Sequence, residues 1–83
     1  MEEERFLVKV FSPFEVYYEG EAFSLSATNS QGPFDVLPEH ANFISLISRG
    51  NVTIDTPFGK RQFALERGIL RIRSGQATLF ANV

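Results

Sequence analysis

The stretch Phe23-Ser24-Leu25-Ser26-Ala27-Thr28 carries the clearest two-residue alternation of apolar and polar side chains in the sequence. Successive side chains of a β-strand point to opposite faces, so this alternation predicts a strand with one face toward a core and the other toward solvent. The turn-forming stretch Asn29-Ser30-Gln31-Gly32-Pro33 follows directly. It predicts that the strand ends in a loop.

Similar short runs extend from this strand to both ends of the chain. They are separated by turn signals, among them Ser12-Pro13 and Glu19-Gly20-Glu21. The pattern predicts roughly eight to ten short strands, which is typical of an all-β sandwich or barrel, in a single domain of residues 1–83. The short apolar run Phe43–Ile47 predicts a buried strand, and 38–44 is the only stretch that we expect to form even one helical turn. The strand-like runs occupy 6–10, 16–18, 23–27, 34–36, 43–47, 52–54, 63–65, 70–72 and 77–81.

The composition is that of a folded domain with an excess of one aromatic residue. Hydrophobic residues make up 43% of the chain and charged residues 22%, so disorder is not expected. There are nine phenylalanines and no tryptophan. Nine phenylalanines are more than one small core needs, so we expect some at the surface in a patch that binds a partner.

Cysteine content and charge narrow the class of protein further. No cysteine is present, which excludes a disulfide framework and a thiolate metal site. The formal net charge of −2 means that the protein as a whole does not attract nucleic acid or an anionic membrane. No apolar run approaches the ~20 residues that span a bilayer. The acidic start Met1-Glu2-Glu3-Glu4 is unlike a secretory signal, so we expect a cytosolic protein whose membrane association comes through a partner.

His40 is the only histidine and therefore the only candidate for histidine chemistry. With Asp35 or Glu39 it offers a pair for acid–base catalysis, and with both it offers three ligands for a metal. Adjacent residues of a strand point to opposite faces, so Glu39 and His40 do not easily converge. A structural or interface histidine is the favoured interpretation.

The remaining polar residues form no catalytic motif. No serine lies in a nucleophile elbow, and the glycines do not form a phosphate-binding loop. Arg71 and Arg73 are two residues apart, so they point the same way from one strand and, with nearby phenylalanines, could face an oligonucleotide. The alternative is a solvated strand face whose arginines pair with Asp55, Glu66 or the acidic residues 2–4. The acidic net charge favours the second interpretation, and we predict a non-catalytic protein.

The central stretch of residues 32–44 carries a family resemblance. Its residues Gly32, Pro38, His40 and Ala41 match a pattern of the form G-x-x-G-x-x-P-x-H-A, which resembles the signature of F-type ATP synthase epsilon subunits. The order of the strands before and after this stretch is similar to that family over nearly the whole chain. Asp35 stands where the family usually has its second glycine, and Pro33 where an acidic residue is frequent.

The resemblance implies a two-sheet β-sandwich with no chemistry and no cofactor of its own. It implies a subunit of the rotor's central stalk that binds the gamma subunit and the c-ring and helps couple proton flow to ATP synthesis. Such a subunit is peripheral on the cytoplasmic face of the bacterial inner membrane. The alternative is a free-standing β-barrel that binds an oligonucleotide or a sugar. The stalk subunit predicts an apolar face with few charges, and the alternative predicts a basic groove with aromatic residues.

The resemblance also assigns residues to partners. Residues that match gamma-facing positions are Ser12, His40, Ala41 and Ser45, and residues that match the loop approaching the c-ring are Ser30, Gln31, Gly32 and Pro33. Members of the family usually continue into a C-terminal helical hairpin that opens with a D-x-x-R-A segment. These 83 residues contain no such segment, so inhibition and ATP binding are not implied.

Overall fold

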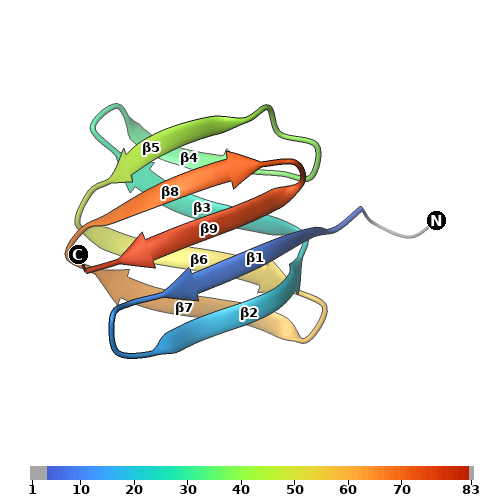
Figure 1. The fold of residues 1–83 in the computed structure, drawn as a ribbon, viewed down its shortest axis with the longest axis horizontal. Helices are drawn as coiled ribbons and strands as arrows, with labels where there is room; N and C mark the ends of the chain where they lie inside the picture. Colours follow the sequence, from blue (N-terminus) through green and yellow to red (C-terminus); the bar gives the residue numbers. More distant parts are fainter. Residues whose placement is uncertain (1–3, 83) are drawn as a thin grey trace.

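Two β-sheets packed face to face make up the computed structural model, which describes residues 4–82 (Figure 1). All nine strands are short, as expected where turn residues recur every few positions. Nine strands confirm the number predicted from the sequence. The strands are β1 (Phe6–Phe11), β2 (Val16–Ala22), β3 (Ser24–Asn29), β4 (Gly32–Val36), β5 (Phe43–Ile47), β6 (Gly50–Thr56), β7 (Gly59–Leu65), β8 (Gly68–Arg73) and β9 (Gln76–Ala81).

The two sheets differ in the number and the order of their strands. The five-stranded sheet has the order β2-β1-β9-β8-β5, and the four-stranded sheet has the order β4-β3-β6-β7. All neighbouring strands are antiparallel except β1 and β9, which pair in parallel. This pairing brings the first and last strands of the chain together at the centre of the larger sheet (Figure 1).

The core lies between the sheets and is built from the inward-facing positions of the alternating strands. In β8, for example, Leu70 and Ile72 are buried while Arg71 and Arg73 are exposed. Leu25 and Ala27, from the stretch with the clearest alternation, are both buried. The apolar residues of the core are Phe6, Val8, Val10, Ala22, Leu25, Ala27, Val36, Ile47, Val52, Ile54, Leu65, Leu70, Ile72, Ala77, Leu79 and Ala81.

The turn predicted at Glu19-Gly20-Glu21 is wrong, because β2 runs through this stretch to Ala22. Gly20 lies opposite Val8 in the ladder, and the Tyr18 hydroxyl is 3.2 Å from the point that a Cβ on Gly20 would occupy. The glycine therefore makes room for the Tyr18 side chain. The loop predicted at 29–33 is shorter than expected, since Gly32 and Pro33 already belong to β4. Proline is tolerated there because β4 is an edge strand.

Phe43–Ile47 forms a strand, as predicted, but the prediction that this strand is buried is wrong. This strand, β5, lies at the edge of the five-stranded sheet, and its Ile44 and Leu46 side chains are 69% and 72% exposed. Strands covered on both faces are typically rich in apolar residues, as β5 is apart from Ser45. Here one face is covered by the core, and the other face is open.

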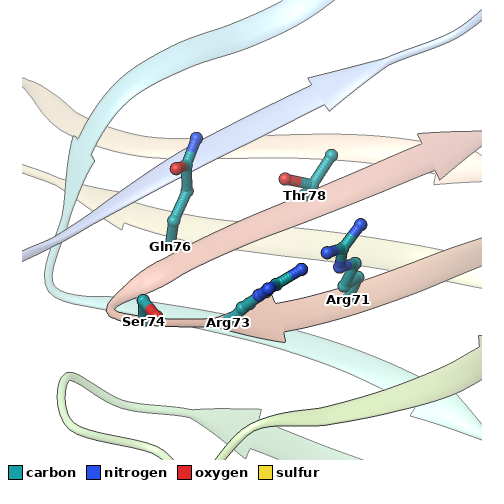
Figure 2. Close-up of a pocket in the computed structure, with 5 residues that line it drawn as sticks. All are labelled: Arg71, Arg73, Ser74, Gln76 and Thr78. Atoms are coloured by element: carbon teal, nitrogen blue, oxygen red, sulfur yellow. The ribbon is translucent and has the colours of Figure 1, made fainter.

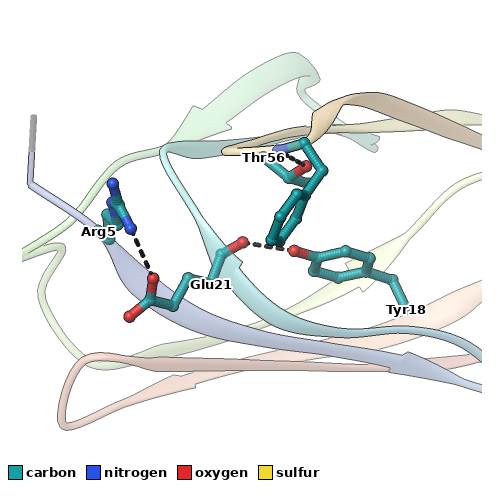
Figure 3. Close-up of polar contacts among 5 residues, drawn as sticks. Arg5, Tyr18, Glu21 and Thr56 are labelled. Atoms are coloured by element: carbon teal, nitrogen blue, oxygen red, sulfur yellow. Dashed lines mark hydrogen bonds and ion pairs between the residues drawn. The ribbon is translucent and has the colours of Figure 1, made fainter.

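Polar contacts fix the end of β2 and the β6–β7 turn (Figure 3). Arg5 forms an ion pair with Glu21 at 2.9 Å, and the Tyr18 hydroxyl donates to the Glu21 carbonyl. Thr56 accepts a hydrogen bond from the Phe58 amide at 3.0 Å, and its hydroxyl donates to the Gly59 carbonyl at 2.7 Å. No helix occurs between residues 4 and 82. This part of the chain therefore contains no helix that is long and apolar enough to cross a membrane.

Candidate interaction surface

An uninterrupted row of apolar side chains crosses the outer face of the five-stranded sheet. Each member is the cross-strand partner of the next, so every strand of the sheet contributes one. Neighbouring strands lie ~4.8 Å apart, so the row is about 19 Å long. We call it the apolar row; it consists of Val16 (β2), Phe11 (β1), Phe80 (β9), Ile69 (β8) and Leu46 (β5).

The ends of the apolar row are more exposed than its centre. Val16 and Leu46 are 52% and 72% exposed, while Phe11 and Phe80 are half-buried. The two phenylalanine rings stack, and the Lys9 ammonium lies 5.1 Å from the centroid of the Phe11 ring. Contiguous exposed apolar patches are typical of surfaces that bind another molecule.

Two arginines of β8 lie on the same face as the apolar row. Arg71 and Arg73 are exposed on β8, as predicted, and they point the same way (Figure 2). The predicted pairing with Asp55 or Glu66 is not formed, since Glu66 pairs with Arg49 at 3.5 Å. Glu2 and Glu3 lie outside the described residues.

Ser12 is buried in the tight turn that joins β1 to β2. Its hydroxyl oxygen accepts hydrogen bonds from the amides of Phe14 and Glu15, at 3.2 and 3.3 Å, and its amide donates to the Glu15 carbonyl at 2.8 Å. The hydroxyl is therefore used within the turn. Phe14, at the tip, is 94% exposed.

His40 and Ala41 lie in the exposed loop between β4 and β5. The His40 amide donates to the Leu37 carbonyl at 3.2 Å, and Glu39 has a positive φ of 69°. The His40 ring packs on Phe43 with centroids 4.7 Å apart. Its Nδ1 lies 2.8 Å from the Ala41 carbonyl, which requires the proton on Nδ1.

Ser45 and the Ser30-Gln31 turn lie close to a contact between β5 of one sheet and β3 of the other. The Asn29 side-chain Nδ2 donates to the Ser45 hydroxyl at 3.2 Å, and the Ser48 backbone amide donates to the Thr28 carbonyl at 2.8 Å. Both bonds tie the end of β5 to the end of β3. Ser30 and Gln31 are exposed just beyond this point, followed by Gly32 and Pro33 in β4.

The fold does not bring the four predicted gamma-facing residues together. β1, β9 and β5 all run in the same direction, because β1 is parallel to β9 and β8 is antiparallel to both β9 and β5. Ser12 follows the end of β1, whereas His40 and Ala41 precede the start of β5. They therefore lie at opposite ends of the sheet (Figure 1). Ser45 and the Ser30-Gln31 turn lie toward the Ser12 end.

The residues weighed for metal binding or catalysis do not form a site. Asp35 accepts a hydrogen bond from the Ser26 hydroxyl at 2.7 Å on the four-stranded sheet, while Glu39 and His40 are exposed in the loop. Within residues 4–82, no three His, Cys, Asp or Glu side chains are grouped so that they could hold a metal ion.

Sequence reasoning missed the apolar row as a unit, although it predicted phenylalanines at the surface. Of the nine phenylalanines, only Phe6 belongs to the buried core. A local signal was available: Val10-Phe11 and Leu79-Phe80 are adjacent apolar pairs in alternating strands, so one member of each pair must face outward. Their alignment into one row depends on strand order, which the sequence does not display.

Comparisons with known proteins agree with this architecture. The family described as the β-sandwich domain of the ATP synthase delta/epsilon chain matches residues 5–83. Similar relatives include an ATP synthase epsilon chain of Psychrobacter cryohalolentis, 32% identical over 89% of this chain and 54% of the relative. Another, from Nitratiruptor sp., is 29% identical over 86% of this chain and 56% of the relative. The chain thus spans little more than half the length of these relatives.

Solved structures show the same fold. A chain in a structure of the central stalk and c-ring of the Tetrahymena thermophila mitochondrial ATP synthase aligns with a TM-score of 0.82 at 10% identity, covering 100% of this chain and 67% of that one. A chain of the Euglena gracilis mitochondrial ATP synthase aligns with a TM-score of 0.85 at 14% identity, covering 93% and 50%.

The fold defines the chain as a two-sheet β-sandwich with a row of apolar side chains on one outer face. The family match covers nearly the whole sequence, including the stretch with Gly32, Pro38, His40 and Ala41. The chain belongs to the ATP synthase delta/epsilon chain family and carries its β-sandwich domain. The predicted family and fold class are confirmed.

Proposed function

We propose that this chain is a non-catalytic subunit of the rotor's central stalk in a proton-translocating F-type ATP synthase. It binds the gamma subunit and the c-ring, so that rotation of the ring turns gamma and proton flow is coupled to ATP synthesis. Membership of the delta/epsilon family supports the proposal, as does a fold shared with a chain in a structure of an ATP synthase central stalk and c-ring. The subunit is held at the cytoplasmic face of the bacterial inner membrane through the complex.

The apolar row is the observation that carries the proposal. It is uncovered in the isolated chain, although β5 has the composition of a strand with apolar neighbours on both faces. Burying each partly exposed member under a partner contributes on the order of 1 kcal/mol. A subunit that must transmit torque needs such a broad, apolar contact.

The positions assigned by resemblance fit a partner that extends along the whole five-stranded sheet. We place the gamma subunit across the apolar row, touching the Ser12 turn and Ser45 toward one end and His40 and Ala41 at the other. The exposed Ser30-Gln31 turn, with Gly32 and Pro33, faces the c-ring in this arrangement. At Ser12, the turn and its exposed Phe14 make the contact, since the serine hydroxyl is occupied.

A matched pair of variants tests the proposal. Leu46→Asp places a charge at an exposed end of the apolar row, and Phe58→Asp places one on an equally apolar but separate site at the β6–β7 turn. Each protein is mixed with the gamma subunit of the same organism and run on size-exclusion chromatography. We expect Leu46→Asp to lose co-elution and Phe58→Asp to retain it. Equal retention by both variants would rule out the apolar row as the gamma contact.

A further inference from the structure

Arg71 and Arg73 form a pair of free positive charges on a protein that is acidic overall. Both are exposed on β8, and their Cα atoms are about 6.6 Å apart, since each strand residue advances the chain by ~3.3 Å. Within residues 4–82 neither guanidinium has an ion pair, a hydrogen bond or an aromatic ring as partner. The two like charges are balanced only by solvent.

A hollow of about 360 Å³ lies beside this pair, over the β8–β9 hairpin. Thr78 is the cross-strand partner of Arg71, and Gln76 is the partner of Arg73, so all four side chains stand on the same face (Figure 2). Ser74, at the hairpin turn, completes the lining. The hollow therefore offers two guanidinium groups, two hydroxyls and an amide, which together supply many hydrogen-bond donors.

No carboxylate interrupts this arrangement. None is among the described residues that line the hollow, and the nearest one along the Arg71 row is Glu19, three strands away. That separation is about 14 Å, longer than the ~8 Å Debye length at physiological ionic strength. Lys9 lies between them, opposite Thr78, and adds a third positive charge to the row. An anion bound here meets attraction without a competing acidic side chain.

A second hollow, of about 380 Å³, lies on the other side of the arginines, over β5 and β8. It shares Arg71 and Arg73 with the first hollow and is otherwise lined by Asn42, Phe43, Ile44 and Ile72. Phe43 and Ile72 face the core, so the outward apolar side chain of this second hollow is Ile44, on the opposite side of the arginine pair from the polar hollow. A ligand that spans both must carry an anionic group attached to an apolar body.

We propose that Arg71 and Arg73 bind the phosphate monoester group of an organic phosphate whose apolar body rests in the β5–β8 hollow. A phosphate monoester carries a charge of −1.5 to −2 at pH 7, close to that of two guanidinium groups. Guanidinium groups match its oxygens with paired hydrogen bonds. The group can come from a free organic phosphate or from the headgroup of phosphatidic acid. This site shares the outer face of the five-stranded sheet with the gamma contact proposed above, so the ligand and the gamma subunit would compete for it, but it rests on observations of its own.

The binding test uses the 83-residue chain and three probes: phenyl phosphate, inorganic phosphate, and phosphatidylcholine vesicles with and without phosphatidic acid. Amide shifts in the NMR spectrum follow the soluble probes, and sedimentation follows the vesicles. Phenyl phosphate is expected to shift the amides of residues 71–78 and to bind more tightly than inorganic phosphate. Sedimentation only with phosphatidic acid assigns the lipid as the source, and binding of phenyl phosphate alone assigns a free monoester.

Two variant pairs decide whether the site is specific. Arg71→Gln with Arg73→Gln is expected to weaken binding of the responding probe by on the order of ten-fold or more, because charge-assisted hydrogen bonds are lost. The control, Lys60→Gln with Arg61→Gln on β7, removes the same charge from the four-stranded sheet and is expected to leave binding within about two-fold. Thermal unfolding checks that both fold. Equal weakening by the two pairs, or no binding of any probe, would overturn the proposal.

Discussion

Phe11 and Phe80 stack on the outer face of the five-stranded sheet, with ring centroids 4.8 Å apart and ring planes within 11° of each other. They come from the two strands that pair in parallel, one near the start of the chain and one near its end. The contact therefore does two things. It joins the termini of the fold, and it forms the centre of the apolar row.

Phe80→Ala is expected to lower the free energy of unfolding by about 1–2 kcal/mol, from the loss of a half-buried aromatic pair. Urea denaturation measures this effect. Phe58→Ala is the control, because Phe58 is 94% exposed and should change stability by less than about 0.5 kcal/mol. A Phe80→Ala protein as stable as the Phe58→Ala protein would show that the stacked pair does not hold β1 and β9 together.

Gly68→Ala is expected to cost about 1–3 kcal/mol, because a Cβ at this buried position would lie 3.0 Å from the Phe80 carbonyl oxygen and 3.1 Å from a Leu79 methyl group. The backbone atom cannot move without disturbing the β8–β9 ladder. Thermal unfolding monitored by circular dichroism measures the loss. Gly75→Asn is the matched control at the neighbouring turn, where the space is open and asparagine tolerates the positive φ of 74°. A neutral Gly68→Ala would contradict the packing described.

Ser12→Ala is expected to destabilise the chain by about 1–2 kcal/mol, because two backbone amides of the β1–β2 turn lose their acceptor. Ser12→Thr keeps the hydroxyl and should recover part of the loss. Chemical denaturation separates the three proteins. If Ser12→Ala is as stable as the parent protein but fails to bind gamma, Ser12 is a contact residue rather than a turn residue.

His40→Ala is expected to leave folding nearly intact, with a loss below about 1 kcal/mol, because the ring is exposed and is held by one hydrogen bond and the Phe43 contact. The same change should weaken binding to the gamma subunit. Comparing the thermal midpoint with the affinity separates the two effects. Unfolding of the variant would make His40 a structural residue and would remove it from the gamma interface.

The sequence predicted those features that depend on local pattern. The alternation at Leu25 and Ala27 identified a half-buried strand, and the turn residues gave a strand number that the structure confirms. The turn predicted at Gly20 was wrong because glycine is common in turns, whereas this glycine lies within β2 and leaves space for the Tyr18 side chain. Strand order could not be read locally. For this reason, the apolar row and the separation of Ser12 from His40 emerged only in the structure.

The same distinction holds for charge. The direction of Arg71 and Arg73 followed from their spacing, whereas their lack of partners depended on which strands lie beside β8. Thr78 and Gln76 became part of the same hollow only through the register of β8 with β9. The spacing of two charged residues in a strand therefore predicts that they share one face of the sheet. What that face can bind depends on the strands that lie beside it.

Titration calorimetry of the 83-residue chain with the gamma subunit of the same organism, at several temperatures, tests the central claim most directly. The account predicts a one-to-one complex whose heat capacity change is negative, because the apolar row is removed from water. It also predicts that Leu46→Asp weakens the complex while Phe58→Asp does not. The absence of binding at high micromolar concentrations, with both proteins folded, would contradict a role for this β-sandwich in holding the stalk together.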